Sequence, residues 1–173
     1  MRHQRMTGLA LAAATLLLGT FAAFAADKPA VDRRAVNKAF ETLKTYDWGT
    51  DRGTLKAIDD AVIATHGNAA ARKDLEKRLA AVLMTGASRA AKDFACRKLT
   101  VIGTAESVPA LAGLLTDKDQ SHMARYALER IPAPEAAQAL REALPRVSGA
   151  PKAGVIGSLG VRRDAASVDA LAS

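Results

Sequence analysis

The strongest hydrophobic pattern in the chain lies between residues 94 and 115, where apolar residues recur at every third or fourth position on both sides of Gly103. This spacing predicts one amphipathic α-helix before Gly103 and a second one after it. Two short amphipathic helices cannot enclose a core by themselves, so the pattern predicts neighbouring units of the same kind. The residues that define this unit are Phe94, Leu99, Ile102, Gly103, Val108, Pro109, Leu111 and Leu115.

The leucines of the second helix recur along the chain with a period of about 30 residues. A period of this length with two helices in each copy is typical of an α-solenoid. The sequence therefore predicts an all-α fold, an α-solenoid of antiparallel helix pairs. The aligned leucines are Leu79 and Leu83, Leu111 and Leu115, Leu140 and Leu144, followed by Leu171.

The first helices of the pairs are aligned by the residues that stop them. Glycine tolerates the left-handed conformation at a helix end, and proline cannot continue a helix. The expected stops lie near Gly67, Gly103, Pro132 and Gly160. This alignment matches Ile63 and Leu128 to Leu99, and it gives a weaker fourth copy with Val155, Ile156 and Leu159. We expect Ser88 and Ser121 to cap the helices that follow them.

Residues 1–25 have the features of a secretory signal peptide. Arg2 and Arg5 precede an apolar run over residues 9–24, and small residues at Ala23 and Ala25 suit cleavage before Ala26. The sequence therefore predicts an exported protein, either periplasmic or secreted. The apolar run is too short for a convincing membrane span, so we expect no stable membrane insertion after the signal is removed.

Residues 26–50 predict an N-terminal capping helix over residues 31–46 and an aromatic loop that contains Tyr46 and Trp48. Terminal repeats must cover an otherwise open core, which favours a covering role for this loop over sugar or peptide binding. Residues 51–173 predict the repeats, and the last repeat looks incomplete at its C-terminal end. We expect either a fragment or a second subunit that covers this end, with self-association through it as an open alternative.

Composition supports helices and argues against nucleic-acid binding. Hydrophobic residues make up 49% of the chain but aromatic residues only 4%, so the core must consist mainly of Ala, Leu, Val and Ile. The formal charge is +7. Its basic residues are interleaved with acids, as in residues 72–78, and no aromatic residue accompanies a basic run as single-strand binding would require. We expect no nucleic-acid partner.

The sequence offers four candidate sites for catalysis or ligand binding, and it gives little support to any of them. Cys96 is the only cysteine and predicts an ordinary helical, at least partly buried thiol, although an intermolecular disulfide stays open. Asp59 and Asp60 are adjacent on a helix and do not converge as a general acid and base would. His122 lies at a helix start, and residues 162–164 form either an anion site or a solvated turn. We expect no catalytic residue, no cofactor and no metal.

The stretch from Leu99 to Leu115, LTVIGTAESVPALAGLL, resembles the short HEAT-like repeat of phycobilisome-lyase-type proteins. That pattern has a leucine, an Ile-Gly turn, a spacer of small residues and then Val-Pro-x-Leu-x-x-Leu-Leu. Residues 167–171 look like a second copy of its last half, with Asp169 in place of the proline. The longer run from Leu43 through Gly160 is similar to exported bacterial HEAT-repeat proteins.

This resemblance implies an exported, non-catalytic scaffold for protein–protein interaction, with the second helices lining the concave side. The alternative is the repeat region of a larger exported enzyme, or an enzyme accessory protein of the lyase type. We expect a protein or peptide partner to bind near the charged and polar residues of the second helices, although ordinary solvated surface is the simpler explanation for any one of them. The candidate residues are Lys77, Gln138, Arg141 and Glu142.

Overall fold

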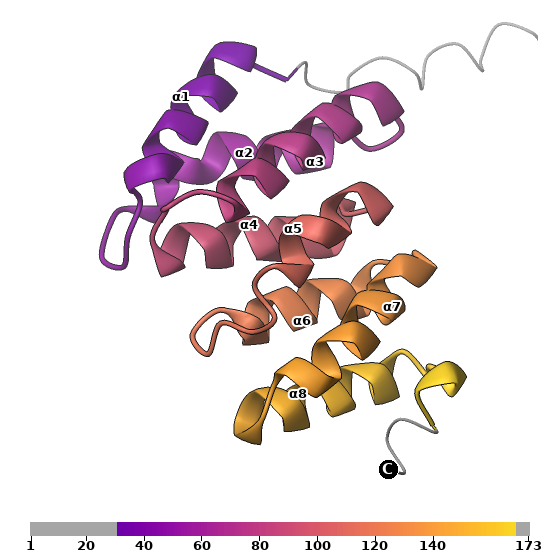
Figure 1. Ribbon diagram of the computed structural model, residues 1–173. Helices are drawn as coiled ribbons and strands as arrows, with labels where there is room; N and C mark the ends of the chain where they lie inside the picture. The colour runs from indigo at the N-terminus through magenta and orange to yellow at the C-terminus, as the bar shows by residue number, and fades with distance from the viewer. Residues whose placement is uncertain (1–30, 169–173) are drawn as a thin grey trace, which may run out of the picture. The chain divides into compact units, whose positions relative to one another are not determined.

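The computed structural model describes residues 31–168, and every regular element among them is helical (Figure 1). This confirms the all-α prediction. The predicted signal peptide and the leucine copy at Leu171 lie outside the described residues. The α-helices are α1 Arg33–Thr45, α2 Lys56–Ala64, α3 Ala69–Leu83, α4 Arg89–Ile102, α5 Val108–Ala112, α6 Ser121–Arg130, α7 Pro134–Ala143 and α8 Gly149–Val161. Short 3-10 helices are η1 Arg52–Leu55, η2 Ala105–Ser107, η3 Leu144–Arg146 and η4 Ala165–Ser167.

The helices after α1 pack in two layers. In one layer, α4 packs against α2 and α6, and α6 packs against α8; we call these four helices the even layer. In the other, α5 packs against α3 and α7, and we call these three helices the odd layer. Figure 1 shows that the helices of each layer follow one another in chain order. Contacts of α3 with α4 and of α6 with α7 join the layers.

Equivalent leucines form the centre of both layers. Leu99, Leu128 and Leu159 of the even layer have no exposed surface, and neither have Leu79, Leu111 and Leu140 of the odd layer. Burying one leucine side chain completely is worth about 1.5–3 kcal/mol. The other apolar residues of the 94–115 unit are also buried, and the proline of that unit stands in the first turn of α5 as predicted. These buried apolar positions are Phe94, Ile102, Val108 and Leu115.

Gly103 ends α4 as predicted, but not for the predicted reason. We expected a left-handed residue, whereas Gly103 is extended, with φ −63° and ψ 143°. A Cβ atom at this position would collide with the carbonyl oxygen of Leu99 and lie 2.8 Å from Cδ1 of Ile131. Glycine is therefore required mainly because the chain leaves α4 close to the backbone of its last turn, and the Ile131 side chain at the end of α6 narrows the space further.

Predictions at two other helix ends have different outcomes. Helix α8 ends at Val161, next to the stop expected near Gly160, but the residue in the left-handed region is Arg163, with φ 52°. Ser88 caps α4, since its Oγ accepts the Ala91 N–H. Ser121 does not cap α6: it is the first residue of the helix, and its buried Oγ has no hydrogen-bond partner.

The predicted alignment of the first helices also changes in two copies. Ile63 does not match Leu99, because α2 ends at Ala64 and leaves Ile63 73% exposed. Ile156 of the fourth copy is 40% exposed and is not a core residue. Counting from the buried Leu159 puts Arg162 at the position that Ile131 holds in the previous copy.

The N-terminal part of the described chain packs largely as predicted. Phe40 and Leu43 of α1 are buried, and Tyr46 at its end is buried as well. The Oγ of Ser88 donates to the Tyr46 carbonyl oxygen and so joins the aromatic loop to the start of α4. The covering role predicted for this loop belongs to Tyr46 and not to Trp48, whose side chain is 63% exposed.

We predict that Gly103→Ala lowers the free energy of unfolding by about 1–3 kcal/mol, the usual cost of overpacking, because the added Cβ has no room. Gly157→Ala is the matched control. No atom lies within 4 Å of a Cβ built at Gly157, so this substitution in α8 should raise stability by about 0.5–1 kcal/mol. Urea unfolding followed by circular dichroism measures both, and equal effects would contradict the role assigned to Gly103.

Candidate functional site

The predicted interaction residues lie on two helices of the odd layer. Lys77 is on α3, and Gln138, Arg141 and Glu142 are on α7, with α5 packed between these helices. Lys77, Gln138 and Glu142 are exposed, whereas Arg141 is half-buried. The exposed part of this set therefore spans the outer side of one layer.

Arg141 already has a partner within the chain. Its Nη1 donates to both carboxylate oxygens of Asp164, at 2.6 and 2.7 Å. Gln138 Nε2 donates to Glu142 Oε1 at 2.9 Å on the same helix face. In the part of the chain that the structure describes, Lys77 makes no such polar contact. Arg141 thus fastens the segment after α8 to α7, and Lys77 is the charge most available to a partner.

Residues 162–164, which the sequence left as either an anion site or a solvated turn, have structural roles. Arg162 Nη1 donates to the carbonyl oxygens of Leu128 and Ile131, both at 2.6 Å, and Nη2 donates to that of Ala133 at 3.0 Å. The last carbonyls of a helix have no partner within it, so Arg162 satisfies the C-terminal end of α6. With Asp164 bound to Arg141, the turn offers only Arg163 to solvent.

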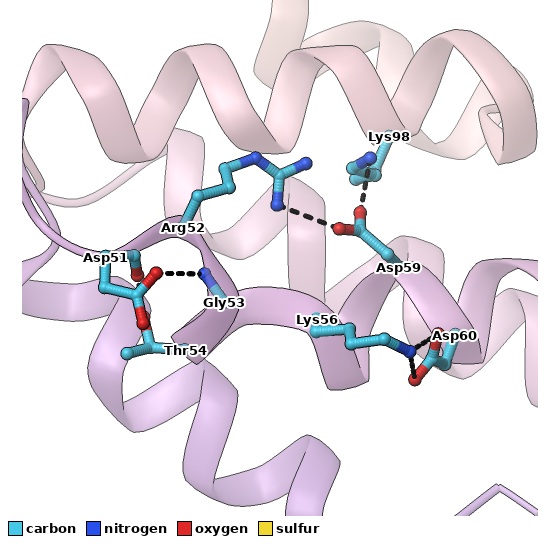
Figure 2. A network of polar contacts seen from close by, with 8 residues as sticks. All are labelled: Asp51, Arg52, Gly53, Thr54, Lys56, Asp59, Asp60 and Lys98. Carbon is cyan, nitrogen blue, oxygen red and sulfur yellow. Dashed lines mark hydrogen bonds and ion pairs between the residues drawn. The ribbon is translucent and has the colours of Figure 1, made fainter.

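Asp59 and Asp60 make separate ion pairs, as their helical spacing predicts. Figure 2 shows Asp59 pointing to Lys98 of α4, while Asp60 is held by Lys56 one turn away on α2. Asp59 accepts from Arg52 Nη1 at 2.8 Å and pairs with Lys98 Nζ at 2.5 Å. The network joins η1, α2 and α4, and it does not assemble a pair of carboxylates for acid–base chemistry.

The two cations control the ionisation of Asp59. Desolvation by burial alone would raise the pKa of this carboxyl group. The hydrogen bonds and positive charges of Arg52 and Lys98 outweigh that effect and hold the pKa below its usual value. Both cations also lie over the ring of Phe94, with Arg52 Cζ 4.7 Å and Lys98 Nζ 5.1 Å from its centroid. Asp59 is thus a charged contact between the first two helices of the even layer.

The pKa of Asp93 is shifted in the opposite direction from that of Asp59. It is 7% exposed, and its Oδ1 has no hydrogen-bond partner. Desolvation by burial raises the pKa of this carboxyl group, although the charges of Arg89, Arg97 and His122 oppose the shift. Sequence reasoning missed Asp93 because it stands between two arginines on the same helix and looks like part of a solvated face.

Cys96 lies one turn from Asp93 and is fully buried. Burial raises the pKa of its thiol to about 12, and the nearby Asp93 charge adds to the effect. The thiol is therefore protonated at neutral pH, and a protonated buried thiol is neither a nucleophile nor a ready metal ligand. The prediction of an ordinary buried cysteine is confirmed.

A groove of about 660 Å³ lies along α1, the end of α2 and the start of α3. Its polar lining includes Arg33, Asn37, Asp74 and Arg78. Arg78 stacks on the Phe40 ring, with Cζ 4.0 Å from the centroid. The sequence carried no signal for this groove, because its lining comes from three separate segments.

Within residues 31–168, no three His, Cys, Asp or Glu side chains are grouped so that they could hold a metal ion. No α-helix of that region combines the length and apolar character needed to cross a bilayer. Comparisons of the chain with family models, with curated proteins and with solved structures found no match.

We predict opposite pH dependences for Asp59→Asn and Asp93→Asn. Asp59→Asn should lower the free energy of unfolding at pH 7 by about 1–2 kcal/mol, as expected for a charged hydrogen bond. This loss should shrink below about pH 4, because a carboxyl with a lowered folded-state pKa contributes its full stabilisation above its unfolded pKa and loses it as the pH falls toward the folded-state pKa. Asp93→Asn should raise stability at pH 7, because folding disfavours the charged form of this carboxyl. That gain should shrink as the pH falls through the raised folded-state pKa and should be gone below about pH 4, the unfolded pKa. Urea unfolding between pH 3 and pH 7 tests both, and a shared sign at pH 7 would refute the assignment.

Proposed function

We propose that this chain is an exported, non-catalytic scaffold that binds a protein or peptide partner through an α-solenoid of HEAT-like repeats. The observation that supports the proposal most is the set of fully buried leucines at equivalent positions of successive helix pairs. Successive pairs pack on one another through both layers from α2–α3 to α6–α7, and α6 packs on α8 beyond them. Antiparallel helix pairs with a period of about 30 residues account for this packing.

The odd layer is the proposed binding side. Solenoids bind partners over extended surfaces made by several repeats. The odd layer also has small exposed residues, Ala81 on α3 and Gly113 after α5. They would allow a partner helix or extended segment to approach the backbone of α3 and α5 closely.

The charges of the odd layer suit a partner of mixed charge. Lys77 is exposed on α3 and Glu142 is exposed on α7, so opposite charges stand at the two ends of the layer. Rim charges of this kind steer and orient a partner more than they add affinity. Arg141 takes no direct part in this proposal, because its guanidinium is bound to Asp164.

The proposed site of action is the periplasm or the outside of the cell, on the evidence of residues 1–25. The C-terminal end of the described layers is a second candidate contact surface, in this case for another copy of the chain. Ile156 of α8 is 40% exposed at the position that corresponds to Arg125 in α6. That apolar exposure supports self-association through this end as an additional property of the scaffold.

Photo-cross-linking tests the binding side. A photoreactive amino acid is placed at Lys77 or at Gln138 in the cells that produce the protein, and at Lys38 on α1 as an exposed control. We expect the same partner to be cross-linked from both odd-layer positions and not from Lys38. The proposal fails if neither position cross-links a partner, or if Lys38 captures the same protein equally well.

A further inference from the structure

Basic charge is concentrated on three helices of the even layer. Helices α4, α6 and α8 carry seven basic side chains and only two acidic ones, Asp93 and Glu129. Asp93 is buried, and Glu129 is half-buried and accepts a hydrogen bond from Ser158 Oγ at 2.7 Å. These three helices therefore expose no acidic side chain. The basic residues are Arg89, Lys92, Arg97, Lys98, Arg125, Arg130 and Lys152.

The odd layer shows no such imbalance. Helices α3, α5 and α7 carry five basic and four acidic side chains, so their charges nearly cancel. Lys73 of this layer is also paired, with Glu106 at 2.5 Å. Helix α2 of the even layer carries one basic and two acidic side chains, so the excess positive charge belongs to α4, α6 and α8.

Exposed apolar side chains gather on the same layer. Val101 of α4 is 59% exposed and Val161 of α8 is 65% exposed, and Tyr126 of α6 is exposed as well. Within α3, α5 and α7 of the described chain no large apolar side chain is exposed to this degree, and Met84, which is 79% exposed, follows the last residue of α3. Because the odd layer covers one side of the even layer, these residues lie on the opposite, outer face.

Basic and apolar residues alternate across this face. Val101, Arg130 and Val161 hold equivalent positions at the ends of α4, α6 and α8, and Arg97 is equivalent to Tyr126 one turn earlier. The Arg130 guanidinium lies 5.3 Å from the centroid of the Tyr126 ring. We call Arg97, Val101, Tyr126, Arg130 and Val161 the outer face.

This combination favours one class of partner. An acidic protein would also pair with the basic charge, but a protein interface has an apolar core inside a polar rim, whereas here single aliphatic side chains alternate with the charges. At a bilayer surface, apolar side chains enter the boundary between headgroups and acyl chains, while Lys and Arg contact phosphate groups. We propose that the outer face binds the surface of a membrane that contains anionic phospholipid.

The binding is peripheral and reversible, and it leaves the odd layer free. The attraction is electrostatic and falls off within a Debye length, so it weakens as salt is added. Arg89 contributes little, because Asp119 in the loop before α6 lies 3.9 Å from its Nη1. The charges that carry the attraction are Arg97 and Arg130.

Vesicle sedimentation of the purified exported chain tests the proposal. The wild type should bind vesicles of equal parts phosphatidylcholine and phosphatidylglycerol, should not bind phosphatidylcholine alone, and should be released by high salt. Arg97→Glu with Arg130→Glu should weaken binding at least about tenfold. The matched control, Lys38→Glu with Lys77→Glu, makes the same change in net charge elsewhere and should bind nearly as the wild type does.

A second pair of variants tests the apolar part. Val101→Ser with Val161→Ser keeps every charge and should weaken binding to the anionic vesicles several-fold, with urea unfolding as the check that the fold is intact. Three results would overturn the proposal: no binding to anionic vesicles, which would point to an acidic protein; equal losses in the two charge-reversed variants; or no effect of the valine substitutions.

Discussion

The fold depends on the mutual burial of leucine stripes between neighbouring helices. Helices of this length are marginal in water by themselves, so each is stable only because its apolar face packs on others. Leu99, Leu128 and Leu159 run through the even layer without any exposed surface, and Leu111 is buried likewise in the odd layer. Each helix pair therefore needs its neighbours, and the most extensive contacts between different pairs, of α4 with α3 and α6 and of α6 with α8, join adjacent pairs.

Close packing of this kind creates a second requirement, which polar side chains meet. Helix ends that are covered by a neighbouring repeat cannot leave their backbone groups without partners. Glu76 of α3 is buried and accepts from the Thr104 N–H at 2.6 Å, and Arg162 binds the last carbonyls of α6. Arg141 holds Asp164 in the same manner. Several charges that look available in the sequence are thus part of the packing, which leaves Lys77 on one side and the outer face on the other.

Local patterns predicted the helices and much of the core, because a period of 3.6 residues is visible within a single element. Phe94, Leu99 and Leu115 were identifiable on that basis. The partners of Arg162 and Arg141 were not, since they lie more than 20 residues away and depend on how one repeat packs on the next. Gly103 was recognised as a stop, but the pattern did not show that a Cβ there would meet the Leu99 carbonyl oxygen of its own helix and the Ile131 side chain of the next one. The sequence assigned the candidate residues of α3 and α7 to one layer, but it could not show which of their charges are paired within the chain.

If neighbouring helices stabilise one another by packing, their opening depends on how many sides are covered, and native-state amide hydrogen exchange over residues 31–168 measures this. Helices packed on both sides open least often, and those at the ends of a layer open more readily. We expect the slowest exchange in α4 and α6, with protection decreasing toward α1 and toward α8. Protection in α8 that equals that of α4, or early exchange of α4 while the ends remain closed, would contradict it.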